Sequence, residues 1–120
     1  MRQLAGRLQA NGLIVYVDAV PLPGPSDLES TDLFALDPET GERVNLTNTP
    51  DIDEFDPTWS RDGSRIAFVS DRGQDEEKRQ NYDVWLMNVD RPQQPVQVTT
   101  NGSHDDCPAW DPSGQTIYFR

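Results

Sequence analysis

Short apolar segments separated by turns predict a chain built from β-strands. Residues 65–69 and 84–89 are largely apolar and rich in β-branched and aromatic side chains, which is typical of strands buried on both faces. Residues 96–99 form a shorter, more polar segment that suits an edge strand, and residues 56–60 complete a set of four. No segment carries a sustained apolar period of 3.6 residues, so we expect an all-β fold.

The turns between these segments have the chemistry of tight β-hairpins. Asp62-Gly63 supplies the positive φ angles that a two-residue hairpin needs, and Pro112-Ser113-Gly114 has the same role later in the chain. A proline follows both Asp56 and Cys107. Because the residue before a proline disfavours the helical region, we expect both residues to be extended.

A set of landmarks recurs along the chain at an interval of 51 residues. A glycine opens each copy of the pattern, at Gly12, Gly63 and Gly114. The apolar triplet after each glycine also recurs, as Val15-Tyr16-Val17, Ile66-Ala67-Phe68 and Ile117-Tyr118-Phe119. Agreement of separate landmarks on one interval indicates an internal repeat.

The interval divides the chain into about two and a third repeats. We place the first repeat at 1–55, the second at 56–106 and the first two strands of the third at 107–120. The first repeat is degenerate at its start, because Leu8 stands where the later repeats have Trp. Residues 6–10 are accordingly either a degenerate first strand or a solvated tail.

The second repeat resembles the repeat of TolB-like β-propellers, a WD40-like type also called PD40. The family pattern runs Pro-x-Trp-Ser-Pro-Asp-Gly, then Ile-Ala-Phe-x-Ser-x-Arg, and this chain matches it over 57–63 and 66–72. Departures are Arg61 in place of Pro, and an exchange of Ser and Asp in the turn of the third repeat. The residues that carry the signature are Pro57, Trp59, Asp62, Gly63, Ile66, Phe68, Trp85, Pro108, Trp110 and Gly114.

The resemblance implies four-stranded antiparallel blades in an incomplete ring, and it leaves the function open. Such propellers occur in a periplasmic Tol-Pal component, in prolyl oligopeptidase-like and tricorn-like peptidases, and in other bacterial proteins. We expect either a fragment of a longer chain or a ring closed by homo-oligomerisation, for example by three chains of two blades each. The resemblance allows a periplasmic or a cytoplasmic location, and the N-terminal segment lacks a clear signal peptide.

The charge composition argues against nucleic acid as a partner. Twenty-one acidic residues stand against ten basic ones, which gives a formal charge of −11. Nucleic-acid affinity depends on Lys and Arg that displace counterions from phosphates. No apolar run approaches the roughly 20 residues of a membrane span. A single cysteine, Cys107, excludes an internal disulfide.

The candidate chemistry favours a protein that is not an enzyme. His104 is the only histidine and no Gly-x-Ser-x-Gly elbow occurs, so we expect no catalytic triad within this chain. Residues 104–107 would alternate between two faces of a strand and could not gather on one metal ion. Residues 51–56 fail the calcium-loop pattern, and we interpret them as a solvated loop in which Asp53 and Glu54 accept backbone amides. We predict no metal and no cofactor.

Strand alternation predicts that acidic side chains gather at one end of the sheets. If the strands of a repeat run up and down in turn, the loops 19–31, 48–56, 71–81 and 100–106 share one face, with twelve acidic and three basic residues. Such a field attracts basic partners, although acidic loops also serve solubility alone. The residues expected to form this acidic face are Asp51, Asp53, Glu54, Asp75, Glu76, Glu77, Asp105 and Asp106.

These features together predict a non-catalytic propeller module that binds a protein or peptide of basic character. The alternative hypothesis is the propeller domain of a prolyl oligopeptidase-like or tricorn-like peptidase whose catalytic domain lies outside this chain. A third hypothesis is a self-assembling ring without a dedicated ligand.

Overall fold

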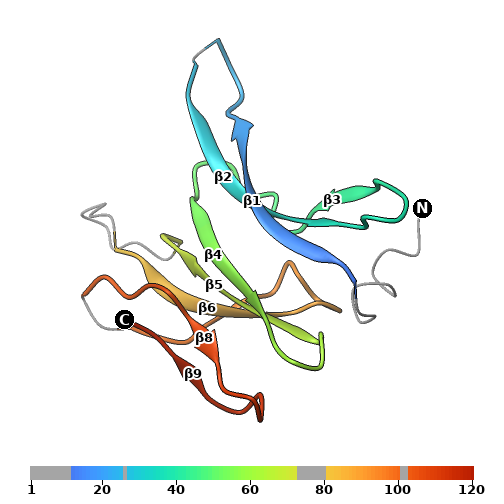
Figure 1. The fold of residues 1–120 in the computed structure, drawn as a ribbon. Coiled ribbons are helices and arrows are strands. Elements are labelled where there is room, and N and C mark those ends of the chain that lie inside the picture. The colour runs from blue at the N-terminus through green and yellow to red at the C-terminus, as the bar shows by residue number, and fades with distance from the viewer. Residues whose placement is uncertain (1–11, 26, 73–80, 101–102) are drawn as a thin grey trace.

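The computed structural model describes residues 12–25, 27–72, 81–100 and 103–120, and these contain nine β-strands and no helix. The strands form three antiparallel sheets of three, four and two strands, which follow one another along the chain (Figure 1). The prediction of an all-β fold is confirmed, and the described residues form no closed ring. The first strand predicted at residues 6–10 lies outside the described residues.

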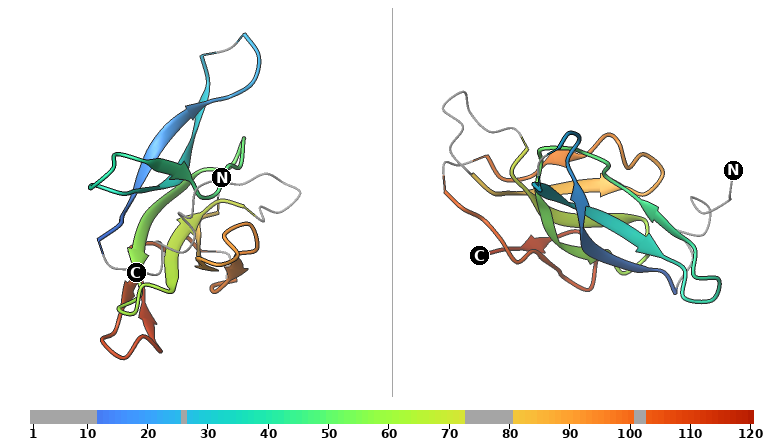
Figure 2. Two further views of the ribbon diagram at one scale, coloured as in Figure 1. Left: turned by 90° about the vertical axis from the view of Figure 1, so that its right-hand side faces the viewer. Right: turned by 90° about the horizontal axis from the view of Figure 1, so that it is seen from above.

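The first sheet contains β1 (Ile14–Pro21), β2 (Glu29–Leu36) and β3 (Arg43–Asn45) in chain order. Its β1–β2 hairpin is long and extends beyond the other sheets (Figures 1 and 2).

The second sheet contains β4 (Glu54–Trp59), β5 (Arg65–Ser70), β6 (Asp83–Asn88) and β7 (Val96–Gln97), again in chain order. These are the four strands predicted for the second repeat, and no strand end differs from its predicted position by more than two residues. Every residue of β5 except the first is buried. In contrast, β7 is a short edge strand that is more exposed. Burial of β5 on both faces agrees with its apolar sequence.

The third sheet contains β8 (Ala109–Trp110) and β9 (Ile117–Tyr118). Trp110 pairs with Ile117 in this hairpin, as Trp59 pairs with Ile66 in β4 and β5. The second and third repeats therefore begin with the same hairpin in the same register.

The expectation that the residues before Pro57 and Pro108 are extended is wrong. Asp56 has φ 52° and Cys107 has φ 53°, so both lie in the left-handed region. The β4–β5 register shifts between Phe55 and Thr58, which marks a β-bulge at this place. A following proline disfavours the right-handed helical region, and the bulge directs the chain into the left-handed region instead of the extended one. The shared φ at positions 51 apart makes the distortion a feature of the repeat.

Hydrogen bonds that occur in both of the larger sheets identify equivalent residues. The Leu33 amide donates to a threonine hydroxyl (3.1 Å), and the Leu33 carbonyl accepts the Leu46 amide (2.7 Å). The Val84 amide likewise donates to a threonine hydroxyl (3.0 Å), and the Val84 carbonyl accepts the Val98 amide (2.8 Å). Leu33 therefore corresponds to Val84, and Leu46 corresponds to Val98.

Strand pairing moves the repeat alignment of β1 by one residue. Ile14 pairs with Leu36 in the first sheet, and Ile66 pairs with Met87 in the second. Because Leu36 is equivalent to Met87, the counterpart of Ile66 is Ile14, whereas the constant 51-residue interval assigns Val15 to that place. A shift of one residue exchanges the two faces of a strand, so it decides which side chains are equivalent.

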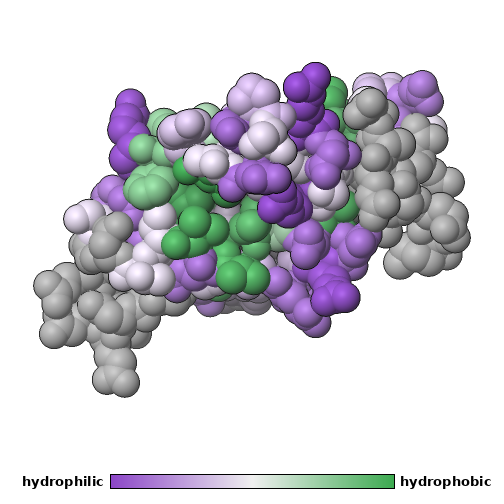
Figure 3. Space-filling model, turned by 90° about the horizontal axis from the view of Figure 1, so that it is seen from below, coloured by the Kyte–Doolittle hydropathy of each residue, from purple (hydrophilic) through white to green (hydrophobic). Residues whose placement is uncertain are grey.

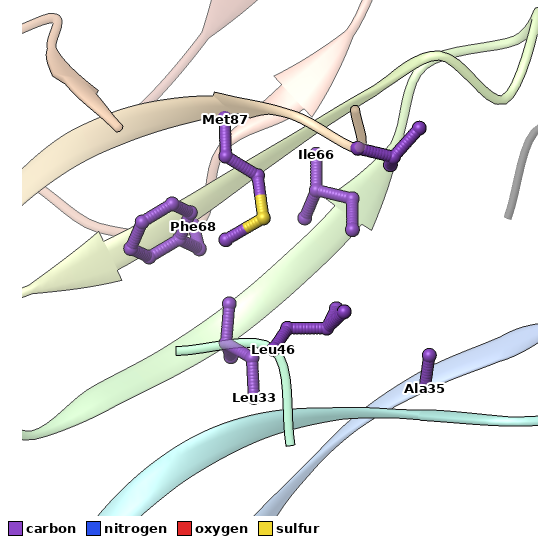
Figure 4. Packing of buried hydrophobic residues seen from close by; sticks show 7 residues of the cluster. Leu33, Ala35, Leu46, Ile66, Phe68 and Met87 are labelled. Carbon is purple, nitrogen blue, oxygen red and sulfur yellow. The ribbon is translucent and has the colours of Figure 1, made fainter. Parts of the chain in front are cut away.

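The first two sheets stack front to back around one apolar core. We call front the face that carries Leu33 in the first sheet and its counterpart Val84 in the second, and back the opposite face. The front of the first sheet packs on the back of the second, where their buried side chains point toward one another (Figure 4). The buried core residues are Leu33, Ala35 and Leu46 from the first sheet with Ile66, Phe68, Met87 and Val89 from the second.

The turn of the second repeat is organised by the carboxylate of Asp62. Its Oδ1 accepts the hydroxyl of Ser60 (2.7 Å) and both the hydroxyl (2.7 Å) and the amide (3.0 Å) of Ser64. In the third repeat the two side chains exchange places, and Asp111 Oδ1 accepts the hydroxyl of Ser113 (2.6 Å). The departure from the family pattern therefore preserves the hydroxyl–carboxylate pair.

We predict that the double variant Ser60→Asp/Asp62→Ser unfolds at the same urea concentration as the natural chain, because it copies the third turn. Asp62→Ser alone should unfold at a lower concentration, since it removes the carboxylate that accepts the hydroxyls of Ser60 and Ser64. Urea unfolding of the three proteins checks this. A double variant as unstable as the single one would mean that the two arrangements are not interchangeable.

The same turn makes stability depend on acid. Hydrogen bonds from the Ser64 hydroxyl, the Ser64 amide and the Ser60 hydroxyl lower the pKa of Asp62 from 3.8 to about 2. A lowered carboxyl pKa contributes stability that is present above pH 3.8 and is lost as the pH falls through about 2. The urea midpoints of the natural chain and of Asp62→Ser should therefore converge over that range.

Equivalent positions in the two sheets should respond differently to truncation. Leu46 is 3% exposed and lies in the core, whereas Val98 is 42% exposed. Leu46→Ala should lower the free energy of unfolding by about 2–5 kcal/mol through loss of burial and a cavity. Val98→Ala should change it by no more than about 0.5 kcal/mol. Equal losses in urea unfolding would show that both positions are covered.

Candidate acidic loop face

Three of the four loops predicted to share one end of the sheets lie together there. They connect β3 to β4, β5 to β6 and β7 to β8, and their described parts gather on one side of the molecule, opposite the tight turns (Figure 1). The fourth predicted loop, 19–31, includes the ends of β1 and β2, and its hairpin extends beyond the other sheets. The Asp53 amide donates to the side chain of Asp71 (2.9 Å), and the Asp105 amide donates to the Tyr82 carbonyl (2.8 Å). These bonds join residues from three loops into one surface.

Asp53 connects the first sheet to this surface. Its Oδ1 accepts the backbone amide of Thr31 on β2 (3.0 Å). In return, the Thr31 hydroxyl accepts the backbone amide of Glu54 (3.1 Å). The expectation that Asp53 accepts a backbone amide is confirmed, and the bond holds the loop before β4 against the first sheet.

Glu54 has a different environment from the one expected. Its side chain is fully buried, and Oε1 accepts the Thr49 hydroxyl (2.6 Å) and a hydrogen bond from the Arg72 guanidinium. A solvated position for Glu54 and a bond to a backbone amide are both wrong, because the residue belongs to β4 and its partners are side chains. The Arg72 guanidinium also lies 5.5 Å from the ring centres of Phe68 and Trp85.

Burial dominates the electrostatics of Glu54. It raises the pKa of Glu54 above 4.5, although hydrogen bonds from two threonines and the charge of Arg72 act in the opposite direction. The side chain of Arg72 is itself only 13% exposed. The pair is therefore a buried ion pair that fastens the end of β5 to the start of β4.

The remaining acidic residues differ in how far a partner could reach them. Asp105 is buried, whereas Asp51 is exposed and Asp106 is half-buried beside Arg120, with 3.2 Å between Asp106 Oδ1 and Arg120 Nε. Asp56, one of the twelve acidic residues counted in the predicted loops but not one of the eight named for the acidic face, is exposed and its Oδ2 accepts the Cys107 amide (3.3 Å). The predicted residues Asp75, Glu76 and Glu77 lie outside the described residues.

Three aromatic rings lie among these carboxylates, and the sequence alone does not reveal them. The Tyr82 ring stacks on His104 with 4.5 Å between centres and meets Phe55 edge-on at 5.0 Å. Burial raises the pKa of Tyr82, and the nearby charges of Asp71 and Asp53 raise it further. Phe55 belongs to β4, Tyr82 to the β5–β6 loop and His104 to the β7–β8 loop, and they share no motif, so only the packing of these three segments brings them together.

Most residues of the predicted repeat signature lie in strands and turns, and several of them connect the repeats. Trp59 and Trp85 pack against the core. The Trp110 indole donates to the Thr58 carbonyl of the second repeat (3.0 Å), and the Arg65 guanidinium lies 4.8 Å from the Trp110 ring centre. Pro57 lies within the bulge in β4 and Pro108 precedes β8, while Gly63 and Gly114 supply positive φ in the turns.

Within the described ranges, no three His, Cys, Asp or Glu side chains are grouped so that they could hold a metal ion. In the same residues, no helix is long and apolar enough to span a membrane. Comparison of the chain with protein-family models and with curated proteins found no match. The acidic face is therefore interpreted from its own geometry.

We predict that Arg72→Met lowers the free energy of unfolding by about 3–5 kcal/mol at neutral pH, because it leaves Glu54 buried without its counter-charge. The exposed residue Arg61 provides the control, since Arg61→Met should change stability by less than about 0.5 kcal/mol.

The loss in Arg72→Met should depend on pH. Burial raises the pKa of Glu54, so its stability contribution is complete below pH 4.5 and is lost as the pH rises through the raised value. Arg72 lowers the pKa of Glu54, so the Arg72→Met variant has a still higher Glu54 pKa. Its loss of stability with rising pH therefore continues to higher pH. Urea unfolding at several pH values should therefore give a smaller deficit in acid, and a deficit independent of pH would contradict the assignment.

Proposed function

We propose that this chain is part of a TolB-like β-propeller that binds a basic protein or peptide segment on its acidic loop face. The blade interpretation is supported by sheets that stack front to back and by a hairpin that recurs in the same register. The binding interpretation is carried by one observation. Three loops bring acidic side chains together at one end, and Arg72, the only Lys or Arg in their described parts, is paired with buried Glu54.

The acidic face divides into a supporting layer and an accessible layer. Glu54 and Asp105 are buried and hold the loops in place. Asp51 and Asp56 are exposed and Asp53 is partly exposed, so these carboxylates remain within reach of lysine or arginine side chains. Because the buried residues already hold the loops in place, a partner that binds the exposed carboxylates would not have to order these loops. The entropic cost of binding is therefore smaller.

A charge-removal experiment tests the proposal. The variant Asp51→Asn/Asp53→Asn/Asp56→Asn removes three charges and keeps an oxygen acceptor at each position. Asparagine also tolerates the positive φ of Asp51 and Asp56. At about 0.5 kcal/mol for each exposed carboxylate, binding should weaken roughly tenfold. The measurement is fluorescence anisotropy with a labelled peptide of alternating lysine and serine at low salt.

The matched control removes three charges from the opposite end of the sheets. Glu39→Gln, Glu42→Gln and Asp90→Asn lie in the tight turns after β2 and β6, and together they change the net charge equally. The control variant should bind the lysine–serine peptide nearly as well as the natural chain. Equal loss in both variants would mean that net charge alone attracts the peptide, and it would contradict a located binding face.

A further inference from the structure

The aromatic side chains on the acidic loop face form one connected group. Tyr82 stacks on His104 with an angle of 13° between the ring planes, and it also contacts Phe55. His104 is exposed, and Phe55 and Tyr82 are half-buried. Part of their ring surface is therefore within reach of a partner. We call Phe55, Tyr82 and His104 the ring group.

Carboxylates border the ring group. Asp53 and Asp56 lie in the same segment as Phe55, two residues before it and one residue after it. The backbone of Asp53 is bonded to Asp71, both through the Asp53 amide (2.9 Å) and through the Asp71 amide (3.2 Å). Burial raises the pKa of Tyr82, and the charges of Asp71 and Asp53 add to this effect, so both carboxylates lie within electrostatic range of the ring.

Two of these carboxylates keep an oxygen atom for a partner. Asp53 uses Oδ1 to accept the amide and the hydroxyl of Thr31, and Asp56 uses Oδ2 to accept the Cys107 amide. Within the described part of the chain, no hydrogen bond reaches Oδ2 of Asp53 or Oδ1 of Asp56. A partner that approaches the ring group can therefore donate to both side chains.

The arginines of this chain show how a ring and a carboxylate together hold a guanidinium. Arg43 lies 4.2 Å from the ring centre of Phe34, and its Nη1 lies 3.4 Å from Asp18 Oδ2. Arg72 likewise lies near two aromatic rings and pairs with Glu54. A planar guanidinium stacks on a ring while its N–H groups bond a carboxylate, whereas the ammonium group of lysine is compact and more strongly hydrated.

We propose that the acidic loop face selects arginine over lysine, because a guanidinium of the partner lies on the ring group while Asp53 and Asp56 accept its N–H groups. This inference rests on the proposed function, since it names the side chain through which a basic partner is held at the same face. The carboxylates attract both kinds of cation, and the rings favour the planar one. The occupant is therefore an arginine-bearing segment of a protein or peptide.

Two labelled peptides of equal length and charge test the inference on the full chain. One alternates arginine with serine and the other alternates lysine with serine, and their affinities are measured by fluorescence anisotropy at low salt. The natural chain should bind the arginine peptide about threefold to fivefold more tightly, which is the effect of one exposed contact between a cation and a ring. The Asp51→Asn/Asp53→Asn/Asp56→Asn variant should bind both peptides more weakly.

Matched variants separate the rings from the carboxylates. Phe55→Leu/His104→Gln removes two rings without adding charge, and the ratio of the two affinities should fall towards one. Phe55→Tyr/His104→Tyr keeps a ring at both positions and should retain the preference for arginine. Urea unfolding verifies that both variants fold. A preference that persists without the two rings would overturn the inference, because the carboxylates alone would then account for it.

A ring exposed on another surface provides a further control. Tyr118 on β9 is 63% exposed and belongs to the third sheet. Seen from the side of β8 and β9, apolar side chains gather in the middle of the molecule with polar side chains around them (Figure 3). Because Tyr118 lies outside the ring group, Tyr118→Leu should leave the preference for arginine unchanged. An equal loss of preference in this variant would overturn the location of the site.

The natural chain also allows a measurement that needs no variant. His104 is the only histidine, so its ring protons give isolated NMR signals. At one fixed pH, saturation with the arginine peptide should shift these signals at least twice as far as saturation with the lysine peptide. Equal affinities and equal shifts would overturn the inference, and binding that still depends on the three aspartates would leave the proposed function intact. Binding that does not depend on them would contradict both.

Discussion

The burial of β5 on both faces is the constraint on which the rest of the structure depends. Ile66 and Phe68 lie against the first sheet, while Ala67 and Val69 face the opposite way and are also fully buried. A strand covered on both faces requires a neighbouring sheet on each side, so the second sheet is stable only as the middle of a stack. The first sheet covers the back of the second sheet, and the short hairpin β8–β9 covers part of its front. The sheets are therefore stacked in the order in which they occur along the chain.

Polar groups at the loop end are organised by the same stack. Where two sheets meet, backbone amides at strand ends need acceptors, and the Asp53 carboxylate supplies one by accepting the Thr31 amide. In the interior, Arg72 and Thr49 donate hydrogen bonds to Oε1 of the Glu54 carboxylate, whereas Oε2 is buried without a hydrogen-bond partner among the described residues. Several of the acidic residues thus hold the sheets together, and only a smaller group of them is exposed.

The sequence predicts the four strands of the second repeat closely, because apolar runs and Asp-Gly turns are local signals. It places β1 one residue out of alignment, since a constant interval cannot reveal an extra residue in a turn. The sequence also predicts an extended backbone at Asp56, which is wrong. The pairing of β4 with β5 contains a bulge there, and Asp56 has a positive φ. Burial of Glu54 and the rings around Tyr82 were not predictable, because both arise where β4 meets loops that are distant from it in sequence.

The exchanged turn residues bear on how this repeat can be detected. Ser60 with Asp62 and Asp111 with Ser113 build the same contact in opposite order. A search that scores each column independently counts two mismatches in the third repeat, although the turn retains its hydroxyl–carboxylate contact. Scoring the two columns as one correlated unit would recover it. Repeats of this type could therefore be more numerous than position-by-position patterns indicate.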